Sequence, residues 1–333
     1  MAYDGKIMRR ALQRFDEDKH QRQDRFEARR ESIFRRQPRL KEIDAELRAT
    51  MSRIISGALR RGTDPRPAVE LMREENLSLQ AEKRRLLTEM HLPEDALDEK
   101  PACALCGDTG YRGAAGCRCL RGYYAREQQK ELSRMLDLGG QSFETISLQW
   151  YSDEDTAGLG ISPRENMDWV YRTCKRYAAQ FHPERSGNLL LTGDPGLGKT
   201  FLSAAIAREV SAEGDSVVYD TASHIFDRFE AQKFGRDETA EDDVARIMSC
   251  DLLILDDLGT EMTTAFVQSA LYQIVNGRIL EQRPTILSTN LKVDERNNEI
   301  AKRYSPQIAS RIEGEYQIMP IFGKDIRLLK KGM

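Results

Sequence analysis

The chain has 333 residues, a length typical of about two domains, and its 51 Lys or Arg against 54 Asp or Glu give a formal net charge of −3. This balance excludes a wholly basic nucleic-acid-binding protein, although it leaves room for a local basic surface. With 40% hydrophobic, 32% charged and only 7% aromatic residues, the composition favours a helix-rich globular protein. No stretch approaches the roughly 20 apolar residues of a membrane helix and no signal peptide is evident, so we expect a cytoplasmic protein without a membrane partner.

Residues 1–100 are predicted to form a helical region. Charged residues dominate 1–36, where sparse apolar residues at helical spacing predict either an ordinary exposed helix or one that binds a partner. Apolar residues in steps of three and four predict a second helix from Pro38 to Gly57 and a third over 68–90. The two helices are expected to form a hairpin, because helix-breaking residues separate them, namely Gly62, Pro65 and Pro67.

Four of the six cysteines fall within residues 101–120, and their spacing predicts a metal-binding module. The pattern is Cys-x2-Cys, ten intervening residues and Cys-x-Cys, formed by Cys103, Cys106, Cys117 and Cys119. Four thiolates complete the tetrahedral shell of a structural Zn²⁺, so zinc is favoured over an iron–sulfur cluster or free thiols. The Cys-x-Cys pair has a shorter spacing than the common Cys-x2-Cys pair, so His91 is an alternative for one of the four ligands.

The second half of the chain has the pattern of an α/β fold. Residues 121–163 are expected to form a linker helix, ended by Gly139 and Gly140, and an irregular segment. From a helix over 164–181 onward, apolar strands alternate with helices, which predicts a parallel sheet in a domain over 164–333. The predicted strands are NLLLTG, SVVYD, DLLILDD and PTILSTN.

Residues 193–200 read GDPGLGKT and predict a phosphate-binding loop between a strand and a helix. The backbone N–H groups of such a loop surround phosphate oxygens. Lys199 is expected to reach the β- and γ-phosphates, and the Thr200 hydroxyl to ligate Mg²⁺. The residues expected to hold ATP here are Gly193, Asp194, Pro195, Gly196, Leu197, Gly198, Lys199, Thr200 and Phe201.

Two further strands end in polar residues that are expected beside this loop. In LLILDD, Asp256 is predicted to hold the Mg²⁺ shell and Asp257 to orient or deprotonate the attacking water. Glu261 is expected to assist. Asn290, after the strand PTIL, is predicted to bond the γ-phosphate or its water.

These motifs resemble the AAA+ ATPase core, and more fully the bacterial replicative-helicase loaders of the DnaC/DnaI type. The resemblance covers about residues 85–330, through GDPGLGKT, LLILDDLGTE, ILSTNL, SPQIASRI, CALCGDTGY with CRCL, and FETISLQWYSD. It implies a protein that binds the hexameric replicative DNA helicase and helps deliver it onto single-stranded DNA. It also implies self-association through AAA+ interfaces, and a helicase-binding role for the N-terminal region and the zinc module.

The resemblance also assigns two arginines. Arg311 matches the residue that reaches the γ-phosphate held by a neighbouring subunit, while Gln307 stands where some loaders carry a second arginine. Arg327 matches the sensor arginine. With the chain ending at Met333, no C-terminal lid domain is expected. Residues 223–236 are predicted either to face DNA or to pack their phenylalanines into the core.

Two other functions remain open at this point. An IstB-type transposition helper ATPase shares the core motifs, but the long helical arm and zinc module are not expected of it. A nucleotide-switched binding module with little ATP turnover is the other alternative, because Asp257 stands where many relatives place Glu.

Overall fold

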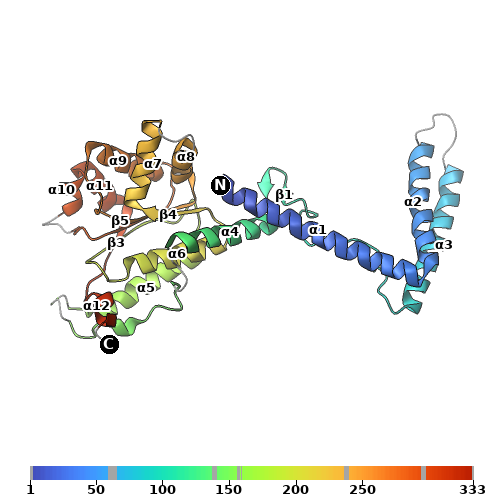
Figure 1. The fold of residues 1–333 in the computed structure, drawn as a ribbon, viewed down its shortest axis with the longest axis horizontal. Helices are drawn as coiled ribbons and strands as arrows, with labels where there is room; N and C mark the ends of the chain where they lie inside the picture. The colour runs from blue at the N-terminus through green and yellow to red at the C-terminus, as the bar shows by residue number, and fades with distance from the viewer. Residues whose placement is uncertain are drawn as a thin grey trace. The chain divides into compact units, whose positions relative to one another are not determined.

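The computed structural model describes residues 3–58, 66–136, 141–155, 158, 160–235, 240–293 and 298–331 (Figure 1). The chain divides into two compact units, one of residues 14–112 and the other of residues 1–13 with 113–333. Several positions singled out in the sequence lie outside the described residues, namely Gly62, Pro65, Gly139, Gly140, Arg236 and Met333.

The smaller unit is built from three helices that lie where the apolar periodicity predicts them. They are α1 (Gly5–Arg36), whose first residues belong to the larger unit, α2 (Pro38–Ala58) and α3 (Arg66–Glu89). The buried side chains of this unit come from the end of α1, the start of α2, the end of α3 and the loop after it: Ile33, Leu40, Ile43, Leu86, Leu87, Ala96 and Leu97.

A five-stranded parallel sheet forms the centre of the larger unit, in the order β4-β5-β6-β3-β7. The strands are β3 (Asn188–Thr192), β4 (Val217–Thr221), β5 (Leu252–Leu258), β6 (Thr285–Thr289) and β7 (Tyr316–Pro320). This arrangement confirms the predicted α/β fold, a parallel sheet between helices that is preceded by a helical region. Four of the strands lie where the sequence predicts them, and β7 is a strand that was not predicted.

Helices cover both faces of the sheet (Figure 1). One face packs against α4 (Arg118–Leu136), α5 (Pro163–Ala179) and α6 (Lys199–Ala212). The other packs against α7 (Ala222–Lys233), α8 (Ala240–Ser249), α9 (Ala265–Leu280), α10 (Glu299–Arg303) and α11 (Pro306–Glu315). Burial on both faces explains the continuous apolar run of β3, where Leu189 and Leu191 enter one core and Leu190 the other.

The helix α4 covers the outer edge of the sheet at β4. The side chain of Gln128 donates to the carbonyl oxygen of Asp215 at 2.8 Å and accepts from the N–H of Val217 at 3.2 Å. A side-chain amide thus pairs two backbone groups on the side of β4 that has no neighbouring strand. The first turn of α1 docks on the same unit, since Asp4 pairs with Arg246 and its N–H donates to the Tyr124 hydroxyl at 3.1 Å.

No helix within the described residues contains a stretch that is both long and apolar enough to cross a bilayer.

Candidate functional site

The loop GDPGLGKT joins β3 to α6, as its sequence predicts. Gly193 has a φ of 150°, and a Cβ there would lie 2.0 Å from the carbonyl oxygen of Ile321. Gly198, immediately before α6, has a φ of 92°. Only glycine adopts these conformations without strain, so both positions depend on it to set the path of the loop and begin the helix.

Lys199 ties this loop to the end of β6. Its ammonium Nζ donates to the carbonyl oxygens of Gly193 at 2.7 Å and Asp194 at 2.9 Å, and to Oδ1 of Asn290 at 2.6 Å. Burial lowers the pKa of Lys199, and the charges of Asp257, Asp256 and Asp194 oppose this effect. The structure therefore holds a buried cation where strand ends and phosphate loop meet.

A cavity of about 410 Å³ opens over the loop, a volume typical of small-molecule sites. Its lining includes these residues predicted from the sequence: Pro195, Gly196, Gly198, Lys199, Thr200, Phe201, Asp257, Asn290 and Arg327. The other predicted residues do not line it, namely Gly193, Asp194, Leu197, Asp256 and Arg311.

A bulge at the end of β5 separates its two aspartates. The pairing of β5 with β6 shifts register between Leu255 and Leu258, and Asp257 has a φ of 54°. Bulges re-aim side chains, and Asp tolerates this left-handed backbone better than most residues. Asp256 is buried and accepts hydrogen bonds from the hydroxyls of Tyr219, at 2.7 Å, and Ser288. Asp257 instead lines the cavity, where burial first and the neighbouring Asp256 second raise its pKa.

One wall of the cavity was not predicted from the sequence. It comes from the irregular segment 141–151, which contains the short 3-10 helix η1 (Leu148–Trp150). The Tyr151 hydroxyl donates to the carbonyl oxygen of Leu197 at 2.9 Å, which fastens this segment to the phosphate loop. Trp150 lines the cavity, and the ammonium of Lys330 lies 5.4 Å from the centre of its ring. The adjacent aromatics in LQWY are the signal that could have revealed this wall.

The C-terminal helix α12 (Ile326–Lys331) contributes a further wall. The N–H of Ile326 donates to the carbonyl oxygen of Gly196 at 3.1 Å. Arg327, whose side chain is 68% exposed, lies 3.5 Å from the Asp325 carboxylate. The predicted sensor arginine is thus carried on a helix that is bonded directly to the phosphate loop.

Two other predicted residues lie away from the cavity. Arg311 is exposed on α11, and Gln307 is exposed one turn earlier. Glu261 is buried, where its carboxylate accepts the Tyr304 hydroxyl and the N–H of Gly259. Glu261 therefore belongs to the packing of the loop after β5.

The predicted DNA-facing segment is split between core and surface. Phe226 and Phe229 of α7 are buried, as the core-packing alternative predicts. Phe234, just after α7, is 57% exposed. Arg228 is committed to ion pairs with Asp220 at 3.3 Å and Asp243 at 3.0 Å.

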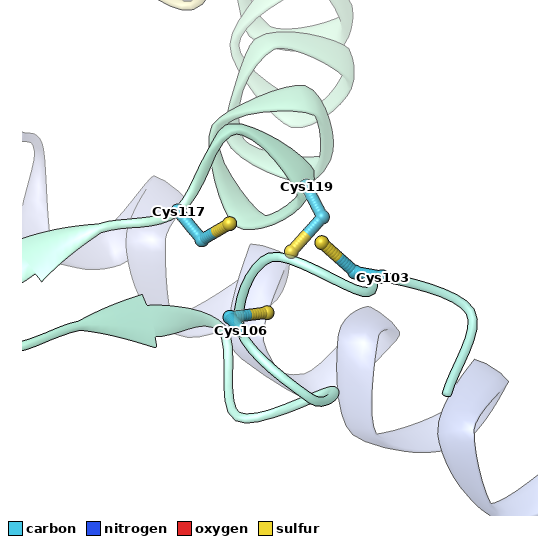
Figure 2. A group of neighbouring side chains, drawn as sticks. All are labelled: Cys103, Cys106, Cys117 and Cys119. Carbon is cyan, nitrogen blue, oxygen red and sulfur yellow. The ribbon is translucent and has the colours of Figure 1, made fainter. Parts of the chain in front are cut away.

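The four clustered cysteines converge on one point, as Figure 2 shows. The Sγ atoms of Cys103, Cys106, Cys117 and Cys119 all lie within 4.8 Å of one another. In a tetrahedral zinc site with Zn–S bonds of about 2.3 Å, the sulfurs stand roughly 3.8 Å apart, so the grouping of these four thiols is compatible with a tetrahedral metal site. The exposed His91 is not part of this group.

Asp108 organises the first cysteine loop. Its carboxylate accepts from the N–H of Ala102 at 2.9 Å and of Cys103 at 2.8 Å, and lies 3.4 Å from the guanidinium of Arg22. The short hairpin of β1 (Tyr111–Arg112) and β2 (Ala115–Gly116) then returns the chain to the second cysteine pair. Such outer contacts hold metal ligands in place before the metal binds.

Known proteins resemble this chain mainly over its second half. A family model described as IstB-like ATP binding protein matches residues 166–332. The replicative helicase loader DnaC of Escherichia coli strain K12 is 31% identical over 130 residues, covering 38% of this chain and 53% of that protein. The chain thus spans about half the length of the curated relatives it matches.

Two solved structures resemble this chain, each with a low TM-score. A crystal structure of the DnaC helicase loader gives a TM-score of 0.44 at 19% identity, covering 54% of this chain and 98% of that one. A crystal structure of DnaI gives a TM-score of 0.43 at 22% identity, covering 60% of this chain and 100% of that one.

Proposed function

Because the chain belongs to the IstB-like ATP-binding protein family, we propose that it is an ATPase that binds a replicative DNA helicase and helps deliver it onto single-stranded DNA. The observation that carries the ATPase part is the cavity that brings together Lys199, Asp257, Asn290 and Arg327. The likeness to a protein named replicative helicase loader supports the choice of a helicase as partner.

The residues around the cavity fit ATP and Mg²⁺. The glycine loop, the N-terminus of α6 and Lys199 offer donors and positive charge to phosphates, while Trp150 offers an aromatic surface. The proposed Mg²⁺ partners are the Thr200 hydroxyl, which lines the cavity, and the Asp256 carboxylate, which is buried outside the cavity lining. Bound ATP supplies a γ-phosphoryl group that water accepts. Asp257 orients that water and takes its proton, and Asn290 helps to position the water. Arg327, which lies on α12, offsets the negative charge of the phosphates.

The role of Asp257 predicts a dependence on pH. Its raised pKa means that the carboxylate becomes protonated, and stops accepting a proton, at a higher pH than an ordinary aspartate. As the pH is lowered, the rate of ATP hydrolysis should therefore fall at a higher pH than it would with an ordinary aspartate as the base. Asp257→Asn should lower the rate by at least about 100-fold, and the rate that remains should no longer show this decrease at acidic pH (the acidic limb of the pH profile). Phosphate release measured across pH tests this, and an unchanged acidic limb in Asp257→Asn would assign the base elsewhere.

Arg311 is proposed to act on the nucleotide held by a neighbouring copy, since it lies outside its own chain's cavity. Arg311→Ala should reduce hydrolysis by on the order of 1,000-fold at protein concentrations that allow self-association, without changing nucleotide affinity. Gln307→Ala, an exposed position on the same helix, is the matched control. Full activity of Arg311→Ala in the oligomer would remove it from the site.

The cysteine cluster is proposed to hold one structural Zn²⁺. Elemental analysis of the purified protein should find one zinc per chain, and Cys106→Ser should lose it. Leu105→Ala, an exposed neighbour in the same loop, should keep it. Because metal binding and folding of such modules are coupled, chelation should also lower the helical signal. Iron in place of zinc, or no metal, would reject the assignment.

Co-purification tests the helicase partnership directly. The tagged full-length chain should retain the replicative helicase of its own organism through a size-exclusion step. Failure to retain it rejects the loader proposal, and capture of a transposase instead would favour the IstB-type helper role. Lys199→Ala in parallel shows whether the association needs a functional nucleotide site.

A further inference from the structure

A second cavity, of about 840 Å³, lies wholly within the unit of residues 14–112. One wall is a face of α1, and the other is the loop that follows α3 together with the start of the cysteine segment. We propose that this groove binds a single strand of nucleic acid, separately from the nucleotide site.

The carboxylates of the groove are largely neutralised by neighbours. Asp95 pairs with Lys100, and Asp98 pairs with Lys83 at 3.0 Å. Asp108 is engaged by two backbone N–H groups and by Arg22. Glu99 is exposed and adds one further negative charge. Most of the acidic charge in the groove is therefore already balanced.

The cations on the α1 face are not balanced in this way. Within the described part of the chain, Lys19, Arg25 and Arg29 form no ion pair with a carboxylate. The pKa of Asp95 is lowered mainly by its hydrogen bond with Lys100, and the charge of Arg29 adds a smaller effect. Residues 1–36 as a whole carry 11 Lys or Arg against 7 Asp or Glu. The groove consequently has an excess of positive charge available to an anionic ligand.

An aromatic side chain lies among these cations. Phe26 lines the groove, and the guanidinium carbon of Arg29 is 5.6 Å from the centre of its ring. Proteins that bind single strands combine a positive groove for the backbone with aromatic rings and arginines for the bases. Lys19 and Arg29 are ten residues apart, or about 15 Å along the helix axis, so the basic face is extended like a strand.

The same features make a docking site for an apolar partner helix a poor fit, because that mode needs a hydrophobic groove. Among its lining residues, Phe26, Ala96, Pro93 and Pro101 are apolar, whereas nine are charged. An acidic protein segment remains the competing class of ligand, and the experiment separates it from nucleic acid.

Fluorescence anisotropy of a labelled oligo(dT) strand with the full-length protein, without nucleotide, tests the proposal. Arg25→Glu with Arg29→Glu should weaken binding at least about 10-fold and flatten its salt dependence, because two phosphate contacts are lost. Phe26→Ala should weaken it about 10-fold through lost stacking. Arg35→Glu with Arg36→Glu, exposed on the last turn of α1 and outside the groove, is the charge-matched control and should have little effect.

Equal strand affinity in the groove variant and the control would overturn the proposal. So would a groove variant that keeps its strand affinity but no longer captures the helicase, since the groove would then serve a protein partner. Each variant is also checked for ATP binding and helical content. If the wild-type chain fails to capture the helicase, that result contradicts the loader proposal alone and does not affect the proposal that the groove binds a single strand.

Discussion

Lys199→Ala is expected to lower ATP hydrolysis at least about 100-fold and to weaken nucleotide binding. The substitution removes the buried ammonium that bonds the carbonyls of Gly193 and Asp194 and the Asn290 amide oxygen, so both a positive charge and the tie between loop and β6 disappear. Phosphate release and the binding of a fluorescent ATP analogue measure the two effects separately.

Lys41→Ala is the matched control for that experiment. Lys41 is an exposed lysine on α2, in the other compact unit, and its loss should leave both measurements unchanged. Equal hydrolysis by wild type and Lys199→Ala would show that turnover does not come from this site. The chain would then be better described as a nucleotide-switched binding module.

Arg278→Leu should cause the largest loss of stability of any single change considered, about 3–5 kcal/mol. Arg278 is fully buried on α9, and its guanidinium bonds the last turn of α8 and the residues before two strands, with no carboxylate partner among the residues that the structure describes. The carbonyl oxygens that would lose their donor are those of Ile247, Met248, Cys250 and Pro284. A buried carbonyl that is left without a donor destabilises the fold by its full desolvation free energy.

Thermal unfolding followed by circular dichroism measures this effect, and the midpoint of the larger unit should fall by on the order of 10 °C. Arg172→Leu is the control, because Arg172 is exposed on α5 and pairs with Asp168 at the surface. That pair should contribute less than about 1 kcal/mol. A midpoint shift as small for Arg278→Leu as for Arg172→Leu would mean that other groups satisfy those carbonyls.

The parts of the fold that follow from local chemistry could be predicted from the sequence. The glycine pattern located the phosphate loop, and the apolar run before Asp256 located a central strand. The cysteine spacing located a cluster whose sulfurs do converge. In each of these cases the residues that meet are close in sequence or lie at the same edge of a parallel sheet.

Features that depend on distant packing could not be predicted. β7 contains Gln317 and ends in Pro320, so nothing in its own sequence marks it as a strand beside β3. Trp150 becomes part of the cavity wall only because Tyr151 is bonded to Leu197, far along the chain. Arg278 resembles any helix-surface arginine until the fold buries it.

The bulge at Asp257 is a subtler case. Adjacent residues on a strand point to opposite faces, and that rule alone would separate Asp256 from Asp257. The structure adds a register shift and a positive φ, which place Asp257 at the cavity while Asp256 stays bonded to Tyr219 and Ser288. The two residues were predicted to have different roles, and the register shift and the positive φ supply a geometric reason for that difference.

Helicase loading onto single-stranded DNA is the most direct test of the central claim. The measurement is unwinding of a forked substrate by the cognate replicative helicase, with the single strand first coated by single-strand-binding protein. Wild-type chain with ATP should stimulate unwinding strongly, and Lys199→Ala should not. The same rate of unwinding with and without the wild-type chain would contradict the loader proposal.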